Sequence, residues 1–308
     1  MEFNHKPVML DECINALNIR VNKTYVDGTL GGAGHSYYIL EKLKGTGRLI
    51  GIDRDKEALE ASSKRLRDFN NKILYHGNHD NITNILKDLN IDKVDGVLLD
   101  LGVSSYQLDN GDRGFSYMKN SSLDMRMNTE DKLSAYEVVN KYSEDNLINI
   151  FKTYGEERFS KKIANKIIEV RKIKHIETTF ELVDIIKSCV KFNKNDGHPA
   201  KRVFQAIRIE VNNELGDLKE AIIDSCKCLN TNGRLAIITF HSLEDRIVKK
   251  AMEELEGRCT CPKDFPKCVC NYISYGKIIT KKPIISTNEE LEENSRAKSA
   301  KLRVFERC

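Results

Sequence analysis

A glycine-rich stretch is the first part of the sequence whose residue types could do chemistry: Asp27-Gly-Thr-Leu-Gly-Gly-Ala-Gly-His35. Glycine lets the backbone approach a ligand closely, and a helix that begins at Ser36, with that serine as its N-cap, would offer free N–H groups. The dinucleotide fingerprint G-x-G-x-x-G, read from Gly32, would need glycine where Tyr37 stands, so a pyrophosphate ligand is disfavoured. Taken alone, the stretch is equally compatible with a tight turn that binds nothing.

Two acidic residues favour a ligand-binding loop over a turn that binds nothing. Asp53 ends a short apolar run about 20 residues beyond the glycines, where an acid can take two ribose hydroxyls, although it could instead cap a following helix. Asp100 ends the run Leu98-Leu99 and is followed by Leu101-Gly102. Because ligands of open α/β sheets bind at the carboxyl ends of the strands, we expect the glycines, Asp53 and Asp100 to converge on one crevice.

The elements that must position these residues alternate between strand and helix patterns. Strands are predicted over residues 24–30, 48–53, 73–75, 94–101 and 233–240, and a last strand over 299–306 with 277–286 as its partner. Helices are predicted over 36–43, 55–66 and 200–229, whereas 105–195 shows helices and loops without a convincing strand. The fold class is therefore α/β, a doubly wound Rossmann-like sheet over residues 1–105 and 200–308 with a helical domain inserted at 106–199.

Composition sets the broad class of protein. Of 308 residues, 40% are apolar and 31% charged, which is typical of a globular chain. No apolar run reaches the ~18 residues of a membrane span, and no secretory signal is visible, so we expect a cytoplasmic protein. The net charge of +4 is too mild to indicate nucleic-acid binding by itself, and the sequence leaves open whether the chain forms a homodimer.

The distribution of charge is more informative than its sum. Residues 158–174 contain seven basic residues and one acid, Glu169. Helical spacing should turn Phe159, Ile163, Ile167 and Val170 toward a core and leave solvent-facing cations: Lys161, Lys162, Lys166, Arg171 and Lys172. A second cluster runs from His198 to Arg202 and is followed by Arg208. Such runs are usually only solvated faces, but this one-signed charge favours contacts with phosphate, and the insertion is the candidate for RNA recognition.

The nine cysteines follow two patterns. Cys13, Cys189 and Cys226 are expected to be small core residues. Four others lie within twelve residues and could hold a structural zinc ion or be free surface thiols, two interpretations that the spacing leaves equal: Cys259, Cys261, Cys268 and Cys270.

Several longer motifs carry a resemblance to a known family. They are Leu-Leu-Asp-Leu-Gly-Val-Ser-Ser (98–105), Arg-Gly-Phe-Ser-Tyr (113–117), Leu-Asp-Met-Arg-Met (123–127), Lys-Thr-Tyr-Gly-Glu-Glu-Arg-Phe (152–159), Phe-Gln-Ala-Ile-Arg-Ile (204–209) and Phe-His-Ser-Leu-Glu-Asp-Arg (240–246). Together with the glycine stretch, they resemble the bacterial 16S ribosomal RNA cytosine N4-methyltransferase family (RsmH, or MraW). The resemblance extends from about residue 5 to residue 307.

The resemblance implies a class I methyltransferase that uses S-adenosylmethionine and a cytidine of the small-subunit decoding region. Matching the motifs one by one assigns seven positions to the cofactor: Ala33, Gly34, His35, Asp53, His79, Asp100 and Gln107. The chain departs from the family at Ala33, where glycine is frequent, and at Tyr106, where proline is common.

The exocyclic amine of cytosine is a weak nucleophile, and an acceptor near its N–H can take up developing positive charge. Asp100 is the hypothesis for that acceptor, and the equal alternative is that it contacts only the cofactor. Phe115 and Tyr117 are candidates for clamping the extruded base, although Phe115 is better explained as a core residue. Tyr154 is a weaker candidate, for lining the substrate cleft. His241 and Ser242 follow the fifth strand, and Ser242 is expected to be a helix cap.

Competing functions remain at this stage. The strand-four acid lacks the Pro-Pro-aromatic sequence of DNA amino-methyltransferases, and the basic insertion argues against a small substrate. The alternative from another class is a non-catalytic RNA-binding ribosome-assembly factor on a methyltransferase scaffold.

Overall fold

The computed structural model describes residues 7–103, 113–190, 197–257, 261 and 272–308. The chain divides into two compact units, residues 1–102 with 215–308, and residues 103–214. The second boundary differs from the one predicted at residue 200. Helix α10 (Lys201–Asn212) belongs to the second unit, because its apolar face, including Val203, Phe204 and Ile207, packs into that unit's core.

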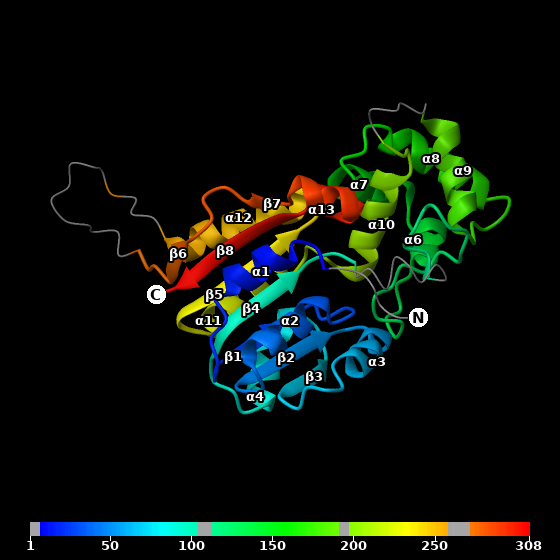
Figure 1. The fold of residues 1–308 in the computed structure, drawn as a ribbon. Coiled ribbons are helices and arrows are strands. Elements are labelled where there is room, and N and C mark those ends of the chain that lie inside the picture. The colour runs from blue at the N-terminus through cyan, green and yellow to red at the C-terminus, as the bar shows by residue number, and fades with distance from the viewer. Residues whose placement is uncertain (1–6, 104–112, 191–196, 258–260, 262–271) are drawn as a thin grey trace. The chain divides into compact units, whose positions relative to one another are not determined.

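The first unit contains an eight-stranded sheet in the order β3-β2-β1-β4-β5-β8-β6, with β7 also paired to β8 (Figure 1). The strands from β1 to β5 are parallel, and β6, β7 and β8 are antiparallel to their neighbours. Their bounds are β1 Thr24–Asp27, β2 Arg48–Asp53, β3 Lys72–His76, β4 Val94–Asp100, β5 Leu229–Thr239, β6 Gly276–Ile278, β7 Ile284–Ile285 and β8 Lys301–Arg307. The strand order reverses between β1 and β4, the switch point at which doubly wound sheets bind ligands.

Helices cover both faces of this sheet. One apolar cluster includes side chains of α1 and α2, and the other includes side chains of α4, α11 and α12. The bounds are α1 Leu10–Leu17, α2 Gly34–Leu43, α3 Lys56–Arg65, η1 His79–Asn81, α4 Ile82–Asp88, α11 Leu218–Lys227, α12 Ser242–Glu256, α13 Asn288–Glu293 and η4 Ser295–Ser299. The predicted α/β class is thus confirmed.

The single helix expected over 200–229 is wrong. It is two helices, α10 and α11, which belong to different units. Asn213 adopts a left-handed conformation with φ of 47° and ends α10, as asparagine does more readily than most residues.

The second unit is helical in its described part. It contains α6 Ala135–Lys141, α7 Glu144–Thr153, α8 Ser160–Arg171, α9 Thr179–Cys189 and α10. Within residues 113–190 and 197–214 there is no named strand, only an isolated bridge between Ser122 and Thr178. No helix among the described residues has the length and apolar character needed to cross a membrane.

Candidate active site

The glycine stretch forms a tight loop between β1 and α2. Gly31 and Ala33 both adopt left-handed conformations, with φ of 50° and 56°. The loop returns to the neighbouring strand, because the Leu30 N–H donates to the carbonyl of Ile52 at 3.0 Å. The predicted helix start at Ser36 is two residues late. Helix α2 begins at Gly34 with Ala33 as its N-cap residue.

Two side chains of α3 fix the loop from outside. The hydroxyl of Ser62, which is fully buried, donates to the Gly31 carbonyl at 2.7 Å. The Arg65 guanidinium donates to the Gly32 carbonyl at 3.0 Å. Since these carbonyls are held, the loop's N–H groups keep a fixed direction. Neither residue is predictable from the sequence, because nothing in the local pattern of α3 indicates a partner 31 and 33 residues away.

Asp53 lies at the end of β2 and braces the same loop. Its Oδ2 accepts the N–H of Gly31 at 2.7 Å, and its Oδ1 accepts the N–H of Asp55 at 2.8 Å. Asp55, not Asp53, is the N-cap of α3, so the alternative role considered for Asp53 is wrong. Burial raises the pKa of the Asp53 carboxyl. Each oxygen of this carboxylate retains a further lone pair for a ligand.

Asp27 is a buried acid at the end of β1. Its Oδ2 accepts the Ser36 hydroxyl at 2.7 Å, and its Oδ1 accepts the Thr29 N–H at 3.2 Å. Ser36 is therefore a partner of Asp27 rather than a helix cap. Burial, opposed in part by these two hydrogen bonds, raises the pKa of Asp27 to about 6. Asp27 is part of the glycine-rich motif, but no role was predicted for it from the sequence.

Asp100 ends β4 beside these groups, and its N–H donates to the Thr29 hydroxyl at 2.6 Å. Its Oδ2 lies 3.7 Å from His35 Nδ1, and His35 Nε2 lies 3.0 Å from the Val8 carbonyl. The Nε2 atom therefore carries the proton, and burial lowers the pKa of His35 to about 4, so the ring is neutral and this contact is not an ion pair. Among the described residues, no donor reaches the buried Oδ1 of Asp100.

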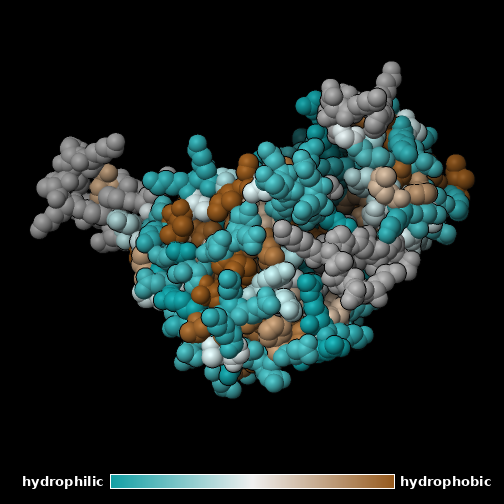
Figure 2. All heavy atoms as spheres, viewed as in Figure 1, coloured by the Kyte–Doolittle hydropathy of each residue, from teal (hydrophilic) through white to brown (hydrophobic). Residues whose placement is uncertain are grey.

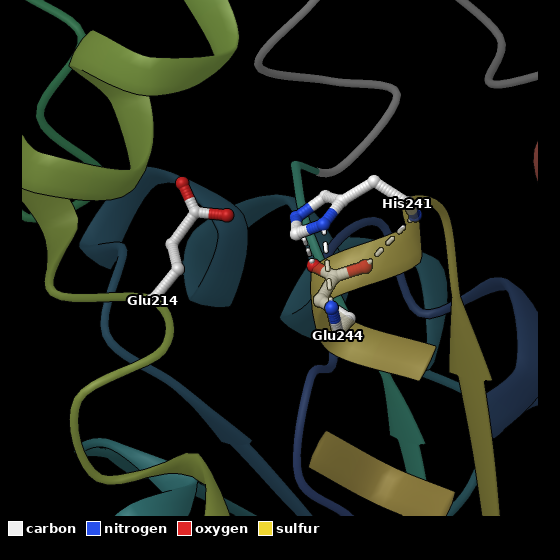
Figure 3. Close-up of side chains that lie close together, drawn as sticks. All are labelled: Glu214, His241 and Glu244. Carbon is white, nitrogen blue, oxygen red and sulfur yellow. Dashed lines mark hydrogen bonds and ion pairs between the residues drawn. The ribbon is translucent and has the colours of Figure 1, made fainter. Parts of the chain in front are cut away.

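A fourth carboxylate follows β5, and like Asp27 it is buried. Glu244, in the first turn of α12, accepts the N–H group of Phe240 at 2.8 Å. It also accepts the N–H of His241 at 3.3 Å, while His241 Nδ1 accepts the Glu244 N–H at 3.3 Å (Figure 3). The N-cap of α12 is thus His241, one residue before the predicted Ser242. The His241 imidazole nitrogen accepts the helix N–H that the Ser242 hydroxyl was expected to accept. Ser242 is the first residue of the helix.

These carboxylates influence one another. Burial raises the pKa of Asp100 well above its ordinary value, and the nearby carboxylates of Asp27 and Glu244 raise it further. A cation bound at the carboxyl ends of β1, β2, β4 and β5 would relieve this repulsion. Together with the unpartnered Oδ1 of Asp100, the site fits a positively charged ligand that can donate a hydrogen bond.

His79 packs against the loop, because a Cβ placed on Gly28 would lie 3.1 Å from the His79 Cβ and 2.5 Å from Leu99 Cδ2. Burial lowers the pKa of His79 to about 4. The positions assigned to the cofactor at 33, 34, 35, 53, 79 and 100 all belong to the first unit. Gln107 lies outside the described residues.

With this geometry in place, comparison with known proteins identifies the chain. The model of the MraW methylase family matches residues 2–308. The chain belongs to the MraW methylase family. It is a methyltransferase.

Relatives of this MraW-family chain are similar over their whole length. Ribosomal RNA small subunit methyltransferase H of Clostridium botulinum (strain Loch Maree) is 60% identical over 306 residues, which is 99% of each chain. The protein of that name from Lachnospira eligens is 55% identical over 310 residues, 100% of this chain and 98% of that protein. An rRNA methylase structure from Streptococcus thermophilus aligns over 98% and 97% of the two chains at 11% identity and a TM-score of 0.43, too low to carry an argument.

The aromatic candidates for substrate contact lie in the second unit of the MraW-family chain. Phe115 is buried in that unit's core, as expected for a core residue. Tyr117 is half-buried, stacks on His198 with ring centroids 4.6 Å apart, and meets Phe204 edge-on. Tyr154 ends α7 and packs against the same core, and its carbonyl accepts the Gln205 side-chain amide at 2.9 Å. The rings of Tyr117 and Tyr154 thus retain exposed area, whereas Phe115 does not.

The basic helix α8 largely follows its predicted pattern. Ile163 and Ile167 are fully buried, and Lys161, Lys162 and Lys166 are exposed. Two predictions are wrong. Phe159 is 47% exposed, because it precedes the helix with non-helical angles and does not share its helical phase. Arg171 is partly buried and donates to the carbonyls of Val139 and Tyr142, so it holds a turn instead of facing solvent.

The second basic cluster is also divided by the structure. Arg202 is exposed, and its guanidinium donates to the Glu156 carbonyl at 3.1 Å. Arg208 instead forms a bidentate ion pair with Glu214: its Nε donates to Oε1 at 2.8 Å and its Nη2 to Oε2 at 2.9 Å. The Arg208 side chain is only 17% exposed. Its charge is neutralised, so the expectation that Arg208 serves phosphate is wrong.

The core cysteines are as predicted, with Cys13, Cys189 and Cys226 all buried. Of the four clustered cysteines, only Cys261 is among the described residues. The alternatives of a zinc site and free thiols for Cys259, Cys268 and Cys270 lie outside them.

Proposed function

We propose that the chain transfers a methyl group from S-adenosylmethionine to the N4 exocyclic amine of a cytidine in the decoding region of 16S ribosomal RNA. This reaction would take place in the cytoplasm, on the RNA or the small ribosomal subunit. The observation that carries the proposal is the set of carboxylates at the strand ends, two of them buried, with the buried Oδ1 atom of Asp100 unpartnered among the described residues.

The first unit would hold the methyl donor. When bound, S-adenosylmethionine supplies an electrophilic methyl group on a positively charged sulfonium. The loop at Ala33, Gly34 and His35 offers backbone groups at the start of α2, and Asp53 offers free lone pairs suited to hydroxyl donors. The excess of buried and partly buried carboxylates favours a cationic donor over a neutral or anionic one.

Asp100 would hold the acceptor amine in reactive geometry and take up its developing positive charge. An ionised carboxylate is needed for this, and a cation in the site would lower the raised pKa of Asp100 toward ionisation. His35, neutral and anchored on the Val8 carbonyl, would limit the directions available to the Asp100 side chain. The same Oδ1 could instead accept a hydrogen bond from the donor molecule alone, and the two roles are separable by kinetics.

The second unit would bind RNA. Its exposed cations at Lys161, Lys162, Lys166 and Arg202 suit phosphate, and the rings of Tyr117 and Tyr154 would border the extruded base. Relatives at 55–60% identity carry the name ribosomal RNA small subunit methyltransferase H, which supports a substrate in the small subunit.

The test is methyl transfer from labelled S-adenosylmethionine to small subunits that lack the modification, followed by nucleoside analysis. Label in N4-methylcytidine is the expected result. An Asp100→Asn protein that binds the donor normally but transfers slowly would assign Asp100 to catalysis, whereas weakened donor binding with an unchanged maximal rate would assign it to the cofactor. If neither subunits nor naked 16S RNA accept label while the donor still binds, the chain is an RNA-binding assembly factor or uses another acceptor.

A further inference from the structure

The start of α8 carries an aromatic ring that the fold leaves in solvent. Phe159 is 47% exposed, whereas the next apolar residues along the chain, Ile163 and Ala164, are fully buried. Its backbone is held on both sides, because its N–H donates to Glu157 Oε1 at 2.8 Å and its carbonyl accepts the Ile163 N–H at 3.0 Å. The ring is therefore presented from a fixed position.

Most charged residues that lie near Phe159 in the sequence are basic. Between residues 158 and 172, the exposed charged side chains are basic except for Glu169. Lys162 and Lys166 are four residues apart within α8, so they lie on the same side of that helix. The Lys162 ammonium donates to the Cys189 carbonyl at 2.9 Å and keeps further N–H groups for an anion. Glu169 pairs with Lys166 at 3.0 Å, but this is an exposed contact of the kind that contributes little and yields to a competing anion.

A second basic cluster converges on the same turn. The Arg202 guanidinium donates to the carbonyl of Glu156, 46 residues away in sequence and three residues before Phe159. The turn and the start of α10 are closely packed, because a Cβ on Gly155 would lie 2.7 Å from the Arg202 carbonyl. Two basic segments that are separate in sequence therefore meet at the turn that leads into Phe159.

An exposed aromatic ring among cations is the arrangement by which proteins bind single-stranded nucleic acid. Most of the described surface in the view of Figure 2 is hydrophilic, and a half-exposed phenylalanine among lysines forfeits burial without serving the core. Charge complementarity selects a polyanion as the occupant, and the flat ring selects one with unpaired bases.

We propose that Phe159 is a stacking platform for an unpaired base of the RNA substrate, with the adjoining phosphates held by Lys162, Lys166 and Arg202. This inference rests on the proposed function and names the part of the second unit that contacts single-stranded RNA. Phe159 is a positioning residue here: it holds the strand and does not touch the reacting atoms.

The chain offers a matched control. Phe180, the second residue of α9, is likewise 43% exposed at the start of a helix of the same unit. Its charged neighbours in sequence are acidic, with Glu177 and Asp184 exposed and Glu181 between them. Phe180→Ala thus removes a phenyl ring from a residue of similar exposure whose acidic neighbours repel RNA.

The experiment measures the affinity of the full chain for a fluorescent single-stranded RNA that contains the decoding-region cytidine, at several salt concentrations. Phe159→Ala and Phe159→Leu should weaken binding about 5- to 30-fold, because stacking on an aromatic ring is lost, whereas Phe159→Tyr and Phe180→Ala should bind like the wild type. Lys162→Ala and Lys166→Ala should each reduce the salt slope by about one. Circular dichroism checks that each variant is folded.

Two results would overturn the inference: equal affinity for Phe159→Ala and the wild type, or full affinity in Phe159→Leu, which would indicate an apolar contact without stacking. Methyl transfer to small subunits separates this inference from the proposed function. If the wild-type protein is active, Phe159→Ala should have a higher KM for small subunits than the wild type and the same KM for the methyl donor. The wild-type protein could instead bind RNA in a manner that depends on Phe159 and yet transfer no methyl group. That result would contradict the proposed reaction but would agree with the role proposed for Phe159.

Discussion

Replacing Asp27 by asparagine should remove a pH dependence from the stability of the first unit. The Asp27 carboxyl is 2% exposed, and its pKa is raised from 3.8 to about 6, chiefly by burial. A shift of about two units corresponds to about 3 kcal/mol between the two protonation states. Because the folded pKa is raised, the folded state favours the protonated acid. The stabilisation is therefore complete below the unfolded pKa and is lost as pH rises from about 4 through about 6.

The measured quantity is the difference in unfolding free energy between the wild type and Asp27→Asn without methyl donor. Hydrogen exchange of the most protected amides of β4 reports on this unit, and comparison at equal pH cancels the intrinsic exchange rates. Between pH 4 and pH 8 the difference should move by about 2–3 kcal/mol in favour of the variant. The substitution also alters the hydrogen bond to Ser36, and this adds to the difference in unfolding free energy a contribution that does not change with pH.

Asp184→Asn is the control, since Asp184 is exposed on α9 and belongs to the other unit. That substitution should leave the difference flat across the same pH range. Parallel stabilities of the wild type and Asp27→Asn from pH 4 to 8 would refute the reasoning. A carbon-13 titration of the Asp27 carboxyl with a midpoint near 4 would do the same.

Further predictions concern the loop, the two arginines and the acid at the end of β4. Ser62→Ala removes the hydroxyl that holds the Gly31 carbonyl, and should raise KM for the methyl donor about 3- to 10-fold with little change in kcat, measured by steady-state kinetics. Arg208→Ala leaves the 5%-exposed Glu214 unpaired and should cost about 2–4 kcal/mol in urea unfolding, without weakening RNA binding. Arg202→Ala should instead weaken RNA binding and lower its salt slope by about one, with little loss of stability. Asp100→Asn should slow single-turnover methyl transfer about 100-fold or more at saturating donor. The wild-type kcat/KM for the donor, which reports on the free enzyme, should fall as pH decreases at a higher pH than for an ordinary aspartate, because the pKa of Asp100 is raised in the empty site.

The strands of the sheet were predictable because their apolar runs are bounded by polar residues. The strand predicted over 48–53 is β2 to the residue, and that over 94–101 exceeds β4 by one residue. The convergence of the glycine loop, Asp53 and Asp100 followed from the rule that parallel strands end at one edge. These inferences need only a local pattern and a general rule of sheet topology.

The helix starts and the supports of the site were not predictable in the same way. The start of α2 depends on the left-handed conformation of Ala33, and that of α12 on an imidazole acting as a cap. The bonds from Ser62 and Arg65 to the loop are tertiary contacts that leave no trace in the pattern of α3. The exposure of Phe159 depends on one residue being outside the helical phase, which periodicity alone cannot locate.

The alanine at position 33 shows how these supports determine the loop. A left-handed conformation costs a residue with a Cβ about 1–2 kcal/mol, which glycine would avoid. Alanine recovers about 0.4–1 kcal/mol by restricting the unfolded chain. Its methyl is fully buried in the apolar cluster on one face of the sheet, worth about 0.8 kcal/mol more. Since these terms nearly cancel, the loop does not depend on glycine here. Its shape is imposed from outside by Asp53, Ser62 and Arg65, which bind the backbone on the N-terminal side of Ala33.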